Sequence, residues 1–72
     1  MKTIIRFKIW DTKEKCYLMR NNSLEDIEFS NKEMADEYRF DYLQKGNYPD
    51  EPITVLQIHE FNNDKFAGCF IG

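Results

Sequence analysis

Alternating apolar and polar residues predict a strand at the start of the chain. Over Thr3–Asp11 the apolar residues Ile5, Phe7 and Ile9 alternate with polar ones, and β-branched and aromatic residues are frequent. One face of this strand is expected to meet a core. The opposite face carries Ile4, Arg6, Lys8 and Trp10. A short polar connection then leads to a second predicted strand over Cys16–Arg20, and the two strands form a hairpin.

The strongest local signal predicts one helix over Asn31–Lys45. Ser30, followed three residues later by Glu33, has the spacing of a capping box, in which two side chains satisfy the free backbone groups at a helix start. Gly46 suits the left-handed position that ends a helix. The helix is therefore bounded by recognisable signals at both ends.

The remaining segments complete a small sheet. Leu24–Phe29 fits either a loop or a short edge strand, whereas Ile53–Phe61 has apolar residues at both parities, as in a central or bulged strand. Asn62–Lys65 has the composition of a turn, and Phe66–Ile71 is the closing strand. The chain is thus predicted to be one α+β domain, residues 1–72, with the order ββ(β)αββ and a single helix packed on one face of an antiparallel sheet.

Apolar residues fall on two sides of the predicted helix when each residue advances by 100°. The group expected to face the core consists of Met34, Ala35, Tyr38 and Tyr42. Phe40 and Leu43 fall among acidic residues, on what should be the outer surface. Two explanations fit: the Tyr48–Pro52 loop folds back over the helix, or Phe40 and Leu43 anchor a contact with another chain.

Composition narrows the class of protein. The 72 residues are 42% hydrophobic and 32% charged, which is typical of a globular domain rather than a disordered chain. No segment approaches the ~20 apolar residues of a membrane helix. Residues 1–20 carry six basic and two acidic side chains, and residues 21–72 carry four basic and eleven acidic ones. A basic end joined to an acidic body suits an oriented contact with a partner, although such imbalance is also common by chance.

The cysteines and the opening residues predict a cytoplasmic protein. Cys16 and Cys69 are too few for a disulfide framework and are expected to be reduced thiols. The first residues lack the apolar stretch of a signal peptide. The chain also lacks metal-ligand spacings and a phosphate-binding glycine loop. We therefore expect no metal, no cofactor, no membrane association and no enzymatic activity.

His59 and Cys69 come nearest to a nucleophilic pair, and the register of the last hairpin decides whether they meet. With a loop over Asn62–Asp64, His59 pairs with Ala67 and Cys69 lies diagonally on the same face. With a loop one residue longer, His59 pairs with Gly68 and Cys69 points to the other face. Both registers lack an oxyanion site, so ordinary sheet residues are the preferred interpretation.

The opening IRFKIWDTKEKCYLM resembles the start of YopX-type phage proteins, in which a basic-aromatic strand ending in Trp-Asp leads through a charged turn to a second strand. The matching residues are Phe7, Lys8, Trp10, Asp11 and Met19, and the match covers about a fifth of the chain. The resemblance implies a small protein encoded by a phage or prophage that acts by binding a host or phage protein. It implies no catalytic residues.

The predicted function is therefore non-enzymatic protein–protein interaction with a host or phage protein, for which a homodimer is one form. The predicted anchors are Phe40, Leu43 and Trp10, since bulky amphipathic side chains dominate interface energetics. The alternative is a nucleic-acid-binding accessory factor that uses the basic hairpin. Its contacts would be Arg6, Lys8, Trp10 and Lys15. A sequence pI of about 5.0 disfavours this alternative, because phosphate neutralisation supplies most of such affinity.

Overall fold

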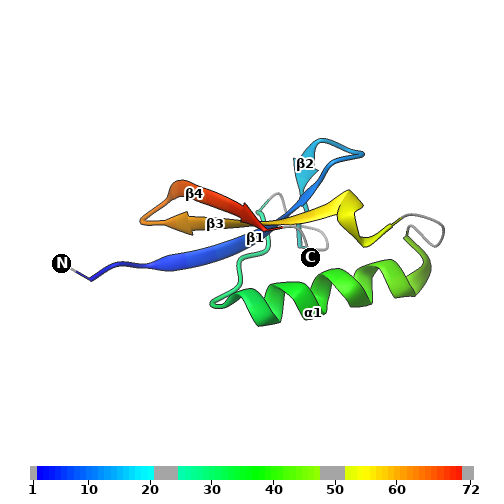
Figure 1. The fold of residues 1–72 in the computed structure, drawn as a ribbon, viewed down its shortest axis with the longest axis horizontal. Coiled ribbons are helices and arrows are strands. Elements are labelled where there is room, and N and C mark those ends of the chain that lie inside the picture. The colour runs from blue at the N-terminus through cyan, green and yellow to red at the C-terminus, as the bar shows by residue number, and fades with distance from the viewer. Residues whose placement is uncertain (1, 21–24, 48–51, 71–72) are drawn as a thin grey trace.

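The computed structural model describes residues 2–20, 25–47 and 52–70 and confirms the α+β class (Figure 1). Its regular elements are β1 (Ile5–Asp11), β2 (Cys16–Tyr17), α1 (Lys32–Tyr42), a π-helical turn (Leu43–Asn47), a 3-10 turn (Ile53–Val55), β3 (Leu56–Asn62) and β4 (Lys65–Phe70). The strands form one antiparallel sheet in the order β2-β1-β3-β4, and α1 lies across one of its faces.

The first strand behaves largely as its pattern predicts. β1 pairs with β3 along its whole length, from Ile5 opposite Asn62 to Asp11 opposite Leu56. The predicted second strand is shorter than expected, because regular pairing ends at Tyr17.

Beyond β2 the chain stays on the free edge of β1 through isolated backbone hydrogen bonds. The Leu18 N–H donates to the Ile9 carbonyl at 2.9 Å, and Phe29 and Phe7 exchange two bonds of 2.9 Å. In the described part of the Leu24–Phe29 segment, residues 25–29, Phe29 bonds to β1 and residues 25–27 bond to residues 18–20, without forming a regular strand. Leu24 lies outside the described residues.

The last hairpin has a tight two-residue turn and a bulge. Asn63 and Asp64 have φ values of 51° and 70°, a left-handed conformation that Asn and Asp tolerate better than most residues. Phe61 then pairs with Phe66, but a shift between Glu60 and Phe61 leaves Ala67 as the extra residue. Because of this bulge neither predicted register holds throughout.

The helix begins one residue later than the capping-box pattern predicts. Asn31, rather than Ser30, is the N-cap, and its side-chain oxygen accepts a 2.8 Å hydrogen bond from the Met34 N–H. Asn and Ser cap helices about equally well, so the local sequence offered two starts. The π-helical turn prolongs the coil to Asn47, and Gly46 lies inside this turn rather than after the helix end.

The side of α1 that faces the sheet differs from the predicted one. Its buried residues follow a four-residue spacing: Ala35, Arg39 and then Leu43. The Arg39 guanidinium is enclosed, since Nη1 donates to the Leu56 carbonyl at 3.2 Å and Nη2 contacts the Asp36 carboxylate. Leu43 is only 8% exposed and belongs to the core, so its predicted place on the outer surface is wrong.

The rotation of α1 leaves two predicted core residues outside. Met34 is 51% exposed and Tyr38 is 37% exposed. The hydrophobic core is formed by both central strands, the helix and the segment after β2. It comprises Phe7, Ile9, Leu18, Ala35, Leu43, Leu56 and Ile58.

Candidate functional site

A shallow open groove of about 530 Å³ runs along the outer side of α1. It is lined by side chains of α1 and by Phe29, which precedes the helix. These residues are Phe29, Met34, Glu37, Tyr38, Phe40 and Asp41. We call this surface the helix groove.

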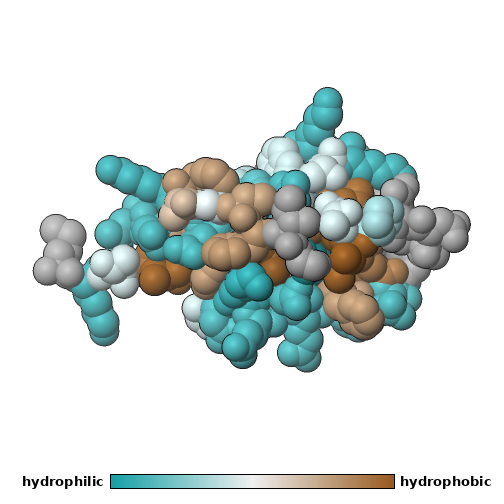
Figure 2. All heavy atoms as spheres, in the orientation of Figure 1, coloured by the Kyte–Doolittle hydropathy of each residue, from teal (hydrophilic) through white to brown (hydrophobic). Residues whose placement is uncertain are grey.

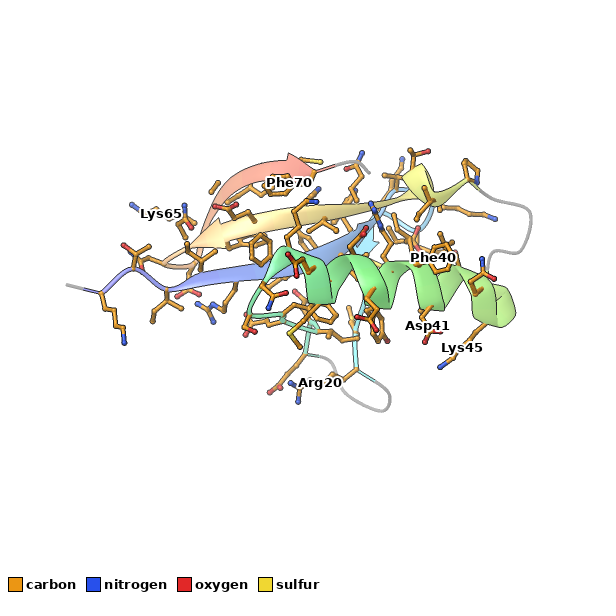
Figure 3. All side chains as sticks on the ribbon, turned by 60° about the horizontal axis from the view of Figure 1, so that its bottom comes forward. Arg20, Phe40, Asp41, Lys45, Lys65 and Phe70 are labelled. Atoms are coloured by element: carbon orange, nitrogen blue, oxygen red, sulfur yellow. The ribbon has the colours of Figure 1, made fainter. Side chains whose placement is uncertain are left out.

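The helix groove exists because the buried line of α1 contains an arginine. With Ala35, Arg39 and Leu43 turned to the sheet, the remaining apolar residues of the helix point away from it. Phe40 is 55% exposed, and Figure 3 shows it on one side of α1, with Asp41 and Lys45 on the other. Several large apolar side chains in one exposed patch are unusual on a small monomer and are typical of an interaction site.

Aromatic contacts hold one wall of the helix groove in place. The rings of Phe29 and Tyr38 lie 5.4 Å apart, and Tyr38 stacks on Tyr42 at 6.2 Å with an interplanar angle of 28°. Burial raises the pKa of Tyr42, with the Asp11 carboxylate as the next contribution. One side of the helix groove is thus a row of aromatic rings in mutual contact.

The helix groove is negatively charged. Asp41 forms an exposed i,i+4 ion pair of 3.1 Å with Lys45. The Glu37 carboxylate, in contrast, has no ion-pair or hydrogen-bond partner among residues 2–20, 25–47 and 52–70. An apolar floor bordered by carboxylates favours a ligand that is apolar and basic at once.

The structure separates the three predicted anchors. Phe40 is exposed as predicted, whereas Leu43 is buried beneath the helix and is unable to contact a partner. Trp10 lies on the other face of the sheet, since it pairs with Tyr17 and Gln57 while its neighbours Ile9 and Asp11 face the core. Phe40 and Trp10 therefore belong to two different surfaces.

The second surface is a layer of rings on the sheet face opposite α1. Its members come from β1, β2, β3 and β4 and contact one another at centroid distances between 4.8 and 5.8 Å. They are Trp10, Tyr17, His59, Phe61 and Phe66, which we call the aromatic cluster. Sequence patterns of single strands gave little sign of it, because the rings meet only after the sheet forms.

Two basic side chains lie close to the aromatic cluster, and both form ion pairs with carboxylates. Lys8 lies 5.1 Å from the Phe61 ring and pairs with Asp26 at 3.1 Å. Arg6 pairs with Glu28 at 3.2 Å and also contacts Asp64.

Of the basic residues predicted to bind nucleic acid, Arg6 and Lys8 thus lie with Trp10 on the sheet face opposite α1, which we call the open face. Lys15 lies instead in the exposed turn between β1 and β2. Two of the acidic residues that pair with these cations, Asp26 and Glu28, come from the segment after β2, where they alternate with apolar residues, and Asp64 comes from the turn between β3 and β4. This alternation is the sequence pattern from which the ion pairs of Asp26 and Glu28 could have been predicted.

His59 and Cys69 are directly opposite each other because of the bulge, and they share the open face. The Tyr17 hydroxyl lies 2.9 Å from His59 Nδ1, and His59 Nε2 lies 3.3 Å from the Gln57 side-chain oxygen. The Cys69 thiol donates to the same Gln57 oxygen at 3.5 Å. Burial lowers the pKa of His59, so the neutral ring accepts from Tyr17 and donates to Gln57. Both ring nitrogens thus engage groups other than the thiol.

No family model, curated protein or solved structure matches this chain. Within the described ranges, no helix is long and apolar enough to cross a membrane. The same residues contain no group of three or more His, Cys, Asp or Glu side chains that could hold a metal ion. The function is therefore inferred from the helix groove and the aromatic cluster.

Proposed function

We propose that this chain is a small non-enzymatic protein-interaction module, of the phage or prophage type that its opening hairpin resembles, and that it binds a host or phage protein. The helix groove is the binding surface. Its occupant is an amphipathic helix of the partner, with apolar side chains on one face and Lys or Arg beside them. The observation that supports this proposal most is that the exposed Phe40 lines the same groove as the Glu37 and Asp41 carboxylates.

Size and chemistry of the helix groove fit such a segment. Met34 and Asp41 are two helical turns apart, so the floor extends over ~10 Å. A helix that lies in a groove presents its anchors at i, i+3, i+4 and i+7, which spans about the same length. Covering the exposed half of Phe40 would contribute ~1 kcal/mol, and Met34 a similar amount. The Glu37 carboxylate, which lacks a partner within the part of the chain that the structure describes, would attract a basic residue at the rim.

Fluorescence anisotropy with a defined peptide tests this proposal. The probe is a labelled helical peptide of about 18 residues with Leu on one face and Lys on the other, and the control peptide carries Glu in place of Lys. We expect the Lys peptide to bind and the Glu peptide not to bind. Phe40→Ala should weaken binding by about fivefold or more, which corresponds to ~1 kcal/mol.

The chain offers a matched control for this substitution. Phe66 is 56% exposed, nearly the same as Phe40, but it belongs to the aromatic cluster on the opposite side. Phe66→Ala should leave the affinity for the Lys peptide unchanged. Equal affinities of wild type and Phe40→Ala, or a loss confined to Phe66→Ala, would contradict the assignment of the helix groove.

A nucleic-acid-binding accessory function is the second candidate. The observation that favours it is the shared face of Trp10, Lys8 and Arg6, because rings beside cations can stack bases. The ion pairs with Asp26 and Glu28 disfavour it, since they neutralise charge that phosphates would need. The test is the affinity of the chain for a labelled oligothymidine, measured at increasing salt concentrations. An affinity that falls steeply with salt and is lost in Trp10→Ala supports this candidate, and a lack of binding at low salt excludes it.

A further inference from the structure

β4 is a sheet edge along whose outer side no other described segment pairs. It is the last strand in the order β2-β1-β3-β4, whereas the outer edge of β1 is covered by hydrogen bonds from Leu18 and Phe29. Natural edge strands are commonly protected by charges, prolines or β-bulges, because their free N–H and C=O groups invite another strand. The bulge of β4 lies at Ala67 and precedes the regularly paired residues Gly68–Phe70. In β4 the sole charged residue is Lys65, next to the turn, and Phe70 marks the opposite end (Figure 3). Hydrophobic side chains reach the surface over β3 and β4 (Figure 2).

We infer that β4 pairs antiparallel with β4 of a second copy of this chain, about a two-fold axis at Cys69. In such a pair the residues that oppose each other must belong to the same face of the sheet. After the bulge, Gly68 and Phe70 lie on the helix side, opposite Glu60 and Ile58, and Cys69 lies on the other side. An axis at Cys69 places Gly68 opposite Phe70 of the partner subunit and so keeps the faces matched.

Gly68 provides space for the partner's Phe70. A Cβ atom built at Gly68 would meet no atom within 4 Å, so the helix-side surface above this residue is open. An aromatic ring directly across from a strand glycine covers the exposed backbone and stabilises the pair. The two-fold axis makes this contact twice, because each copy supplies one Gly68 and one Phe70.

Charges at this edge are complementary between two copies. The Lys32 ammonium lies 5.4 Å from the centre of the Phe70 ring. Glu60, which faces Gly68 on β3, has no ion-pair partner within the described part of the chain. In the dimer, Glu60 of the partner subunit lies two strand spacings, or ~10 Å, from Phe70. Lys32, which lies over Phe70, and this glutamate have side chains long enough to meet across that distance. This reciprocal pairing favours a second copy over an unrelated strand.

The dimer would join two four-stranded sheets into one continuous sheet. Its contacts come from β4, Glu60 and Lys32, and none of these residues lines the helix groove. The dimer and the proposed partner binding therefore succeed or fail independently.

Oxidative cross-linking tests the axis, because the chain has a second exposed thiol as a control. Opposite residues of an antiparallel pair have Cα atoms ~4.5–5.5 Å apart, which is within the range that a disulfide bridges. In the Cys16→Ser chain, diamide should rapidly oxidise two Cys69 thiols to one intermolecular disulfide. The Cys69→Ser chain, which keeps the exposed Cys16, should cross-link at about one tenth of that rate or below. Equal rates in the two chains would overturn the proposed axis.

Sedimentation equilibrium with charge reversal tests the interface itself. Glu60→Lys should weaken the dimer about tenfold or more, and Lys32→Glu combined with Glu60→Lys should restore it. Glu14→Lys, in the exposed turn far from β4, is the control for a changed net charge. A wild-type chain that remains monomeric at about 100 μM, or a double variant as weak as Glu60→Lys, would overturn the proposal. Far-UV circular dichroism shows that each variant is folded.

Discussion

The orientation of α1 can be tested by two substitutions on the same helix, Leu43→Ala and Phe40→Ala. The structure places Leu43 in the core and Phe40 on the surface, at 8% and 55% exposure. The sequence pattern instead places both residues on the outer side. The two arrangements therefore differ most in the cost of Leu43→Ala.

The expected costs follow from burial. Leu43→Ala removes three carbon atoms that contact the core, at ~0.8 kcal/mol each, and leaves a cavity, so the total should be about 2–4 kcal/mol. Phe40→Ala removes a ring that is already more than half in water, and its cost should be below about 1 kcal/mol. For a domain of this size the Leu43→Ala cost corresponds to a decrease in Tm of roughly 10–30 °C.

Urea denaturation measures both costs. Trp10 is the sole tryptophan and lies in the aromatic cluster, away from both substitutions, so its fluorescence reports unfolding without direct perturbation. The denaturant slope should be unchanged, and the free energy of unfolding should fall far more for Leu43→Ala. A cost for Leu43→Ala below about 1 kcal/mol, or a larger cost for Phe40→Ala, would refute the described orientation of the helix.

Three further outcomes are expected. Because burial lowers the pKa of His59, the unfolded chain binds a proton at this residue more readily than the folded chain, and the free energy of unfolding should fall as the pH drops below about 6.5. Urea midpoints at pH 7.5 and 5.5 measure this loss, and the part due to His59 should vanish in His59→Gln. Asn31→Ala should cost about 1 kcal/mol in thermal unfolding while Ser30→Ala costs little, and the reverse order would return the N-cap to Ser30. Asn63→Ala should destabilise by about 1–2 kcal/mol, since it loses tolerance of a positive φ and the 2.9 Å hydrogen bond from the Ile4 N–H; a neutral effect by calorimetry would contradict the described turn.

Much of the fold could be predicted from local patterns. The alternation in Thr3–Asp11 and the Asn-Asp turn chemistry identified β1 and the last hairpin. The apolar residues at both parities of Ile53–Phe61 correctly indicated a central strand, but residues 53–55 form a 3-10 turn, and the bulge lies in β4 rather than in β3. The position of the bulge was not predictable, because inserting Ala67 opposite Phe61 depends on the whole sheet. Register, and hence the meeting of His59 with Cys69, is decided by tertiary structure.

The candidate site was predicted only in part, and the reason is Arg39. A pattern that treats arginine as a surface residue turns Met34 and Tyr38 toward the core and Leu43 outward. The long Arg39 side chain instead fills the space under α1, with its guanidinium bonded to the Leu56 carbonyl. Phe40 is exposed under both orientations, which is why it alone of the predicted helix anchors remains a candidate.

The most direct test of the proposed function is chemical-shift mapping of the labelled chain with the Leu–Lys helical peptide. We predict that the amide resonances that move on addition of the peptide cluster on α1, around Met34, Glu37, Phe40 and Asp41, and that the Glu-containing peptide moves none of them. Shifts that concentrate instead on the aromatic cluster, around Trp10, or no shifts at peptide concentrations that saturate anisotropy, would show that the helix groove is not the binding surface.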